Sequence, residues 1–211
     1  MVPIRENLVP KDKYAIKCPY TRTPTRVVIH NTANDAPAAN EISYMRYNDL
    51  EISFHYAVDD VNIVQGIPEN RNAWASGDGH GKGNMEGIHI EICYSKSGGE
   101  KFDKAEQNAA EFTASLLKKY GWAIDKVTKH RDYDGKYCPH RTLDRGWQRF
   151  LSMVKRYMEP AKAPVASKFI PYLIRKNCRD ALNIRKGPST NYGILGQIKD
   201  TLRYTIVEEH S

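Results

Sequence analysis

Residues 88–94 read IHIEICY, an alternation of apolar and polar side chains. Successive side chains of a β-strand point to opposite faces of its sheet, so the three isoleucines share one face and the opposite face carries His89, Glu91 and Cys93. The segment Ile88–Tyr94 is therefore predicted to be a strand with one apolar face. The pattern leaves two interpretations of Glu91 open: a solvated face residue, or a carboxylate with a chemical role.

Strands and helices alternate around this segment. Further strands are predicted over Arg26–His30, Ser53–Val58, Asn62–Gly66 and Val127–His130. Helices are predicted over Pro37–Asn48, Asp103–Tyr120 and Thr142–Met158. Asp103 and Glu106 are spaced as a capping box, and five glycines between Asn70 and Gly87 predict a loop. Together these elements predict a mixed α/β domain.

The 211 residues are enough for one medium domain and one small domain. Residues 1–158 are predicted to form the larger domain, and residues 159–167, which read EPAKAPVAS, are predicted to form a linker. Residues 168–211 contain short strand-like runs separated by turn residues, which predicts a small all-β unit. The runs are Phe169–Ile174, Ala181–Arg185, Gly193–Ile198 and Tyr204–Val207.

The net charge of +7 is concentrated near the C-terminus, since residues 161–211 hold 9 Lys or Arg but only 4 Asp or Glu. Such a basic region suits an anionic partner, which can be nucleic acid, an anionic lipid surface or an anionic cell-wall polymer. A soluble domain with surplus lysine is the plain alternative. No basic recognition helix or aromatic RNA-binding signature accompanies the charge, so a nucleic-acid partner is not expected.

Composition excludes other classes of protein. The longest apolar stretches are a few residues, such as Val27-Val28-Ile29, whereas a membrane-spanning helix needs roughly 20, so no membrane insertion is expected. No secretory signal is readable in the first residues. Four scattered cysteines do not make a disulfide framework, and synthesis in a reducing cytoplasm is expected.

Two histidines and a cysteine are candidates for a metal site. His130 and Cys138 flank a turn at Asp134-Gly135, and His30 ends a predicted strand. Two neutral imidazoles and one thiolate supply three zinc ligands and leave a fourth position for water, as in catalytic zinc sites. Spacing alone also permits ordinary surface or core histidines, and other sets could be drawn from seven His and four Cys.

Two charged residues fit chemistry beside such a site. Glu91 suits a general base whose pKa is set by its surroundings. Lys136 lies two residues before Cys138, and on an extended stretch both side chains point the same way. An ammonium group there would stabilise an oxyanion. A solvated turn lysine is the alternative interpretation.

Five segments carry a resemblance to a known family: VVIHNT, SFHYAVDD, QGIPENRNAWASGDGHGKGN, IHIEICYSKSGG and KHRDYDGKYCPH. They resemble, in order, the zinc-dependent N-acetylmuramoyl-L-alanine amidases of the type-2 amidase family, which also contains the animal peptidoglycan recognition proteins. The likeness is greatest to Bacillus cell-wall amidases and to endolysins of phages that infect Bacillus. It spans nearly all of residues 1–158.

The resemblance implies a fold, a cofactor and a set of site residues. The fold is a central mixed β-sheet flanked by helices, with one Zn²⁺ held by His30, His130 and Cys138. Glu91 takes the position of the catalytic carboxylate, and Lys136 lies near the developing oxyanion. Some relatives have Tyr where this chain has Phe54, which cannot donate a proton. The residues expected to contact substrate are Asn31, Thr32, His55, Trp74 and Asp78.

The segment ALNIRKGPSTNYGILGQI, residues 181–198, resembles bacterial SH3-type cell-wall-binding domains. Members of that family usually continue for further strands that contain a Trp and a Gly-Trp pair, whereas this sequence ends at Ser211. Residues 168–211 are therefore expected to be a partial SH3-like unit.

These resemblances imply hydrolysis of the amide between N-acetylmuramic acid and L-alanine in bacterial peptidoglycan. Peptidoglycan is the expected partner, and anionic wall polymers would suit the basic C-terminal region. The protein is expected to be made in the cytoplasm and to reach the wall by a holin-type or other route without a signal peptide. A phage endolysin and a bacterial autolysin both fit. A wall-binding protein without turnover is the alternative function.

Overall fold

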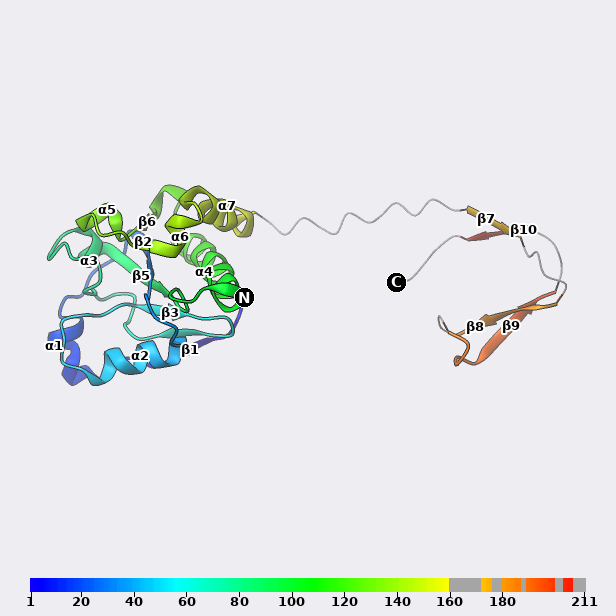
Figure 1. Ribbon diagram of the computed structural model, residues 1–211, viewed down its shortest axis with the longest axis horizontal. Coiled ribbons are helices and arrows are strands. Elements are labelled where there is room, and N and C mark those ends of the chain that lie inside the picture. Colours follow the sequence, from blue (N-terminus) through cyan, green and yellow to red (C-terminus); the bar gives the residue numbers. More distant parts are fainter. Residues whose placement is uncertain (160–171, 176–179, 187–188, 200–202, 207–211) are drawn as a thin grey trace. The chain divides into compact units, whose positions relative to one another are not determined.

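A six-stranded sheet forms the centre of the first of two units, Met1–Ala161, in the computed structural model (Figure 1). The strand order is β1-β4-β3-β5-β2-β6. The strands are β1 (Ile4–Glu6), β2 (Arg26–Asn31), β3 (Tyr56–Val58), β4 (Ile63–Gln65), β5 (Gly87–Ile92) and β6 (Val127–Lys129). β3 and β4 pair antiparallel as a hairpin, and the other neighbouring strands pair parallel. The mixed sheet is thus confirmed.

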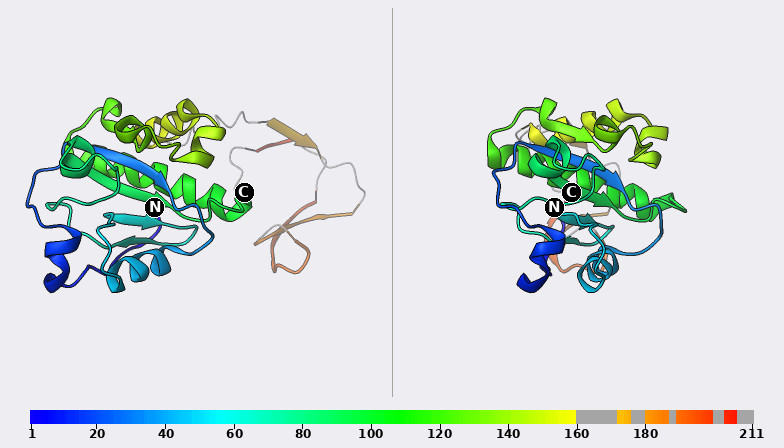
Figure 2. Two further views of the ribbon diagram at one scale, coloured as in Figure 1. Left: turned by 60° about the vertical axis from the view of Figure 1, so that its left-hand side comes forward. Right: turned by 90° about the vertical axis from the view of Figure 1, so that its left-hand side faces the viewer.

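Helices cover this sheet. They are α1 (Tyr14–Lys17), α2 (Ala38–Tyr47), α3 (Lys82–Glu86), α4 (Gly99–Tyr120), α5 (Arg131–Asp134), α6 (His140–Asp144) and α7 (Trp147–Met158), with short 3₁₀ turns η1 (Lys11–Lys13) and η2 (Ile124–Lys126). α2 packs on β3 and β4, α4 packs on β3 and β5, and α7 packs on α4. Figure 2 shows α1 and α2 (blue) and α7 (yellow-green) on opposite sides of this unit.

The core lies between the sheet and these helices. Ile88, Ile90 and Ile92 of β5 are fully buried, as the alternation of IHIEICY predicts. They join apolar residues of α2 and α4 in one cluster, including Ile42 and Phe102. Burial of each such side chain contributes roughly 1.5–3 kcal/mol to the free energy of unfolding. The core therefore fixes β5 in the middle of the sheet, and with it the polar face of that strand.

Two helix boundaries differ from the prediction. α4 begins at Gly99 rather than Asp103, because Gly98 and Gly99 adopt φ of 75° and 71° and allow the chain to turn into the helix. Glu106 is consequently not part of a capping box. Its carboxylate is buried and accepts hydrogen bonds from Arg149 and Arg145.

The predicted helix Thr142–Met158 is two helices, α6 and α7. They are separated at Gly146, which has φ of 99°. Likewise, the predicted loop Asn70–Gly87 contains the short helix α3. The Asp78 carboxylate accepts hydrogen bonds from the backbone N–H groups of Gly83 (2.7 Å) and Asn84 (3.0 Å) and so holds the start of that helix.

The structure describes residues 1–159, 172–175, 180–186, 189–199 and 203–206. All but Glu159 of the predicted linker 159–167 lies outside these residues. The second unit, Lys162–Ser211, contains β7 (Tyr172–Arg175), β8 (Leu182–Arg185), β9 (Ile194–Ile198) and β10 (Arg203–Ile206), paired antiparallel as β7-β10 and β8-β9. The strands fall near the predicted positions, and the SH3-like assignment stays a prediction.

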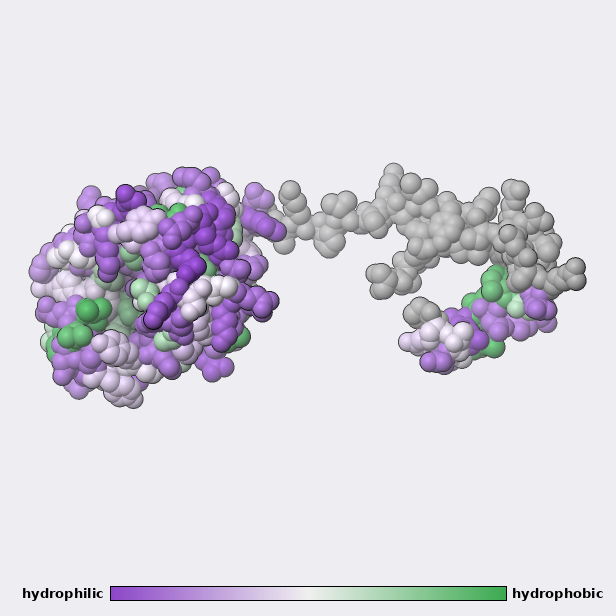
Figure 3. Space-filling view, in the orientation of Figure 1, coloured by the Kyte–Doolittle hydropathy of each residue, from purple (hydrophilic) through white to green (hydrophobic). Residues whose placement is uncertain are grey.

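Figure 3 shows a mainly hydrophilic surface over the first unit, with small apolar areas. Within the described residues, no helix is both long enough and apolar enough to span a bilayer.

Candidate active site

The sheet brings three predicted metal ligands to one edge. β2 lies beside β6 in parallel, so His30 and the residue that follows β6, His130, emerge at the same end. The backbone N–H of His130 donates to the carbonyl of Ile29 (3.3 Å) and continues the ladder. Cys138 is placed next to them because its carbonyl accepts a hydrogen bond from the N–H of Arg131 (3.0 Å).

The ligand atoms of His30, His130 and Cys138 lie within 4.8 Å of one another, and all three side chains are buried. The two Nδ1 atoms are 3.2 Å apart, and the Cys138 Sγ is 4.0 Å from the Nδ1 of His30. The convergence predicted from the sequence is therefore present in the fold.

The chemistry of this donor set fits zinc. Burial holds the pKa of His30 well below its usual range and also lowers the pKa of His130, so both imidazoles are neutral, as metal ligands must be. Burial, reinforced by the charge of Glu91, raises the pKa of the Cys138 thiol to about 12. A cation at the site would replace that proton, since coordination favours the thiolate.

Two residues that the sequence analysis did not select, His89 and Asp134, contact the Nε2 atoms of the two imidazole ligands. The Nε2 of His30 is 2.9 Å from the Nδ1 of His89, and the Nε2 of His130 is 3.0 Å from the Oδ2 of Asp134. Because both contacts use Nε2 atoms, the Nδ1 atoms of His30 and His130 stay free to face the candidate metal position. The i, i+4 spacing of His130, which directly precedes α5, and Asp134, which ends it, was a signal available in the sequence.

Glu91 lies directly beside the candidate metal site. β5 pairs with β2 so that Glu91 is opposite His30, and its Oε1 is 4.0 Å from the His30 Nδ1. The side chain is 16% exposed, which excludes the solvated-face interpretation. Burial, aided by the charge of Glu41 and opposed by Lys136, raises the pKa of Glu91 to about 8. Its Oε2 has no hydrogen-bond partner among the described residues.

Lys136 lies at the rim of the same site, and its side chain is exposed. The backbone there makes a three-residue turn, with the N–H of Cys138 donating to the carbonyl of Lys136 (2.7 Å), so the extended stretch expected from the sequence is wrong. Both side chains nevertheless line one cleft. The Lys136 charge also contributes to lowering the pKa of His30 and His130.

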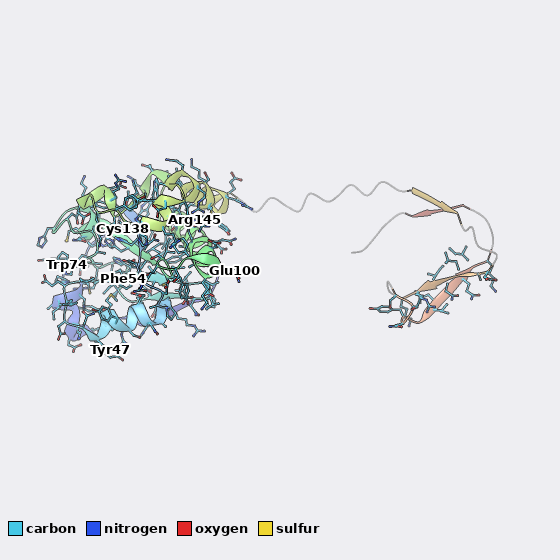
Figure 4. All side chains as sticks on the ribbon, viewed as in Figure 1. Tyr47, Phe54, Trp74, Glu100, Cys138 and Arg145 are labelled. Carbon is cyan, nitrogen blue, oxygen red and sulfur yellow. The ribbon has the colours of Figure 1, made fainter. Side chains whose placement is uncertain are left out.

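The cleft has a volume of about 1010 Å³, and its lining includes His30, Glu91, His130, Lys136 and Cys138. Asn31, Thr32, Phe54 and Trp74 line it too. Figure 4 labels Cys138, Phe54 and Trp74 on this part of the first unit.

The five residues expected to contact substrate divide into two groups. Asn31, Thr32 and Trp74 line the cleft, whereas His55 and Asp78 do not. His55 is fully buried, and its Nδ1 accepts a hydrogen bond from the backbone N–H of His89 (3.0 Å). Asp78 holds the start of α3, as described above.

Aromatic residues that the sequence analysis passed over extend the cleft wall at Trp74. The rings of Tyr20 and His80 lie 6.2 and 5.7 Å from the Trp74 ring, edge to face. The indole is itself held by a hydrogen bond from its Nε1 to the carbonyl of Ile16 (3.0 Å). This part of the cleft wall is therefore aromatic. The sequence alone did not indicate it, because Tyr20 is distant in sequence from Trp74 and His80.

Comparison with known proteins gives a consistent result. Residues 20–141 match the model of the family described as N-acetylmuramoyl-L-alanine amidase. The chain is 50% identical over 181 residues to the N-acetylmuramoyl-L-alanine amidase XlyB of Bacillus subtilis (strain 168), an alignment that covers 83% of this chain and 57% of that protein. It is 51% identical over 176 residues to the amidase CwlA of the same organism, covering 79% and 65%. The chain thus spans less than two thirds of these relatives.

Solved structures are similar as well. The structure of PlyL matches with a TM-score of 0.71 and 52% identity, covering 72% of this chain and 97% of that one. The solution structure of the PlyG catalytic domain matches with a TM-score of 0.72 and 50% identity, covering 78% and 100%.

Proposed function

Because the chain belongs to the N-acetylmuramoyl-L-alanine amidase family, we propose that it hydrolyses the amide between N-acetylmuramic acid and L-alanine in bacterial peptidoglycan, and that it needs zinc to do so. The observation that carries the proposal is the convergence of two imidazole nitrogens and one sulfur beside a largely buried carboxylate, in the lining of one cleft.

His30, His130 and Cys138 would hold the zinc ion through Nδ1, Nδ1 and Sγ. Zinc at such a site supplies a Lewis acid that polarises the scissile carbonyl and lowers the pKa of water. Glu91 accepts the proton of the attacking water at a carboxylate oxygen, for which the unpartnered Oε2 is available. The same carboxyl group then delivers the proton to the nitrogen of the departing L-alanine.

Lys136 stabilises negative charge that develops on the carbonyl oxygen. Its position at the rim, where it can reach the substrate carbonyl, supports this role. Phe54 lines the cleft without a hydroxyl group, which leaves Glu91 as the proton carrier. Asn31, Thr32 and Trp74 contact the substrate. Asn31 is fixed for this task because its Oδ1 accepts a hydrogen bond from the N–H of Thr142 (3.2 Å).

The site of action is the cell wall, where anionic polymers attract the basic C-terminal region. A phage endolysin and a bacterial autolysin both fit this proposal.

The experiment is digestion of purified Bacillus cell walls, followed by mass spectrometry of the soluble products. Metal-loaded protein should release stem peptides with a free L-alanine amino group, and a chelator should stop the release until zinc is restored. Absence of such peptides would leave only wall binding. Release at the full rate from protein shown by metal analysis to be zinc-free would refute the zinc requirement.

Metal analysis of Cys138→Ser tests the ligand set separately. A serine hydroxyl is a poor zinc ligand at neutral pH, so this variant should retain far less zinc than wild type after dialysis against a weak chelator. Cys93→Ser is the matched control, because Cys93 is also buried but is not in the ligand set. Stoichiometric zinc in Cys138→Ser would remove the thiol from the site.

A further inference from the structure

His89 is a buried histidine beside the candidate metal site that the proposed mechanism does not use. It lies on β5, on the same face as Glu91, and is 0% exposed. Its Nδ1 is 2.9 Å from the Nε2 of His30, and the two ring centroids are 5.1 Å apart. His89 is not in the set of ligand atoms that converge on the metal position. It instead contacts His30, one of the proposed metal-binding residues.

The proton positions of this pair follow from what His30 must do. To offer the lone pair of Nδ1 to a metal, a neutral His30 must carry its single ring proton on Nε2. That N–H then needs an acceptor, because an unpaired donor in the interior is costly. The acceptor within reach is the Nδ1 of His89, which must therefore be unprotonated. His89 in turn carries its proton on Nε2, an atom that has no hydrogen-bond partner among the described residues.

Neighbouring groups hold the His89 ring in place. It stacks on the ring of His55, with centroids 5.6 Å apart and an interplanar angle of 15°. The backbone N–H of His89 donates to the Nδ1 of the same His55. The Nε2–H of His55 donates to the backbone carbonyl of Arg71 (2.9 Å), which anchors the stack.

Glycine at position 87 leaves the room that the ring requires. A Cβ at Gly87 would lie 3.2 Å from the Nε2 of His89 and 2.5 Å from the Cγ2 of Val28. The ring therefore fits closely between β2 and the start of β5.

We propose that His89 is a positioning residue, which fixes the tautomer and the orientation of His30 for zinc by accepting the hydrogen bond of its Nε2–H. The inference rests on the proposed zinc site. Hydrogen-bond partners of this kind set the ring orientation of metal-binding histidines, and losing one typically weakens metal binding about 10–100-fold. His55 acts indirectly, by holding the His89 ring in place.

Two variants separate an acceptor role from simple packing. His89→Asn keeps an acceptor, because the Oδ1 of Asn occupies the place of the histidine Nδ1. His89→Leu keeps the bulk of the side chain but accepts no hydrogen bond. The measurement is zinc affinity, by competition with a chromophoric chelator. The leucine variant should bind zinc about 10–100-fold more weakly than wild type, and the asparagine variant should stay within a few-fold of it.

Ile90→Val is the control for lost packing in the same strand, since Ile90 points to the opposite face. It should leave zinc affinity unchanged. If only the space filled by the ring matters, leucine will bind zinc as wild type does and asparagine will be the weaker variant, which overturns the proposal.

A second measurement needs no variant. In ¹⁵N-histidine NMR of the zinc-loaded protein, His30 should be protonated at Nε2 and His89 should be unprotonated at Nδ1. A proton on the His89 Nδ1 would overturn the inference, whether or not His89→Leu folds. Neither readout depends on amidase turnover. Wild-type protein that binds no zinc would refute the zinc site itself, whereas normal zinc binding by His89→Leu would refute only the role of His89.

Discussion

At the scale of single residues, the proposed chemistry depends on a carboxylate in a place that is unfavourable for a charge. Glu91 lies on a central strand, where water that would stabilise its charge is largely excluded. The same exclusion raises its pKa to about 8, because burial penalises the charged form. A carboxyl group with a pKa near neutrality exchanges protons readily at working pH, and a cation held by His30 would favour its ionised form.

Replacing Glu91 by glutamine tests that role. Glu91→Gln keeps the shape of the side chain but cannot accept the proton, so the rate of amide cleavage should fall by about 10²–10⁴-fold. Zinc content, measured by metal analysis, should stay at one per chain because Glu91 is not in the ligand set. Turnover near the wild-type rate in the zinc-loaded variant would exclude Glu91 as the proton carrier.

The site residues that could be predicted from the sequence were those whose side-chain type has a specific chemical use, such as metal binding or proton transfer. Two histidines, a cysteine and a strand carboxylate suggest a metal and a base wherever they meet. The i, i+4 spacing of His130 and Asp134 was the one available signal for a residue behind a ligand. Spacing could not show that His89 lies behind His30, because that contact depends on ring orientation. For the same reason the sequence did not show that His55 is buried behind the site.

At the scale of helices and strands, alternation and helical spacing predicted the larger elements and missed those defined by partners. The strand β5 could be predicted from the alternation of its own residues. β1 has three exposed residues and exists because it pairs with β4. The break between α6 and α7 at Gly146 and the early start of α4 both depend on glycines with positive φ. Their neighbours in sequence do not distinguish such glycines from ordinary ones.

One carboxylate ties the C-terminal end of α4 to β3 and to the loop after β4. Glu69, in the loop after β4, accepts hydrogen bonds from Lys119 (2.6 Å), from Tyr120 and from Tyr56 (2.5 Å). Burial raises the pKa of Glu69, but these donors outweigh burial and the net pKa is lowered. A folded-state pKa below the unfolded value makes the ionised form a source of stability above the unfolded pKa, and this stability is lost as pH falls through the folded value.

Glu69→Gln should therefore lower the melting temperature at neutral pH and make less difference as the pH drops below about 4, the usual range of a glutamate. Thermal unfolding followed by circular dichroism across pH 3–7 measures both proteins. Glu100→Gln, an exposed substitution on α4, is the control. A difference between Glu69→Gln and wild type that grows toward acid pH would contradict the sign of the shift.

At the scale of the whole molecule, the charge is divided unevenly along the chain. The surplus of positive charge lies mainly in residues 161–211, while the candidate active site lies entirely in Met1–Ala161. The proposed catalysis and the proposed wall attraction thus belong to different parts of the sequence. The Pro- and Ala-rich composition of residues 159–167 predicts a linker between these parts, and this assignment stays a prediction.

This division predicts different salt responses for binding and cleavage. Retention of the full chain on purified walls should fall between 50 and 500 mM NaCl, because salt screens attraction between exposed charges. Cleavage of a small soluble muramyl peptide should change much less over the same range. Sedimentation of the protein with walls and chromatography of the peptide products measure the two. Wall retention that is independent of salt would exclude charge as its source.

The register between β2 and β5 has a consequence for how this chain can change. His30 and Glu91 face each other across a ladder of backbone hydrogen bonds, so the separation of acid and ligand is fixed by the interior of the sheet. Loops at the rim other than the one that carries Lys136 and Cys138 can therefore be exchanged without moving Glu91 relative to His30. A one-residue insertion in β5 before Glu91 would instead turn the carboxylate toward the apolar core and end the proposed chemistry.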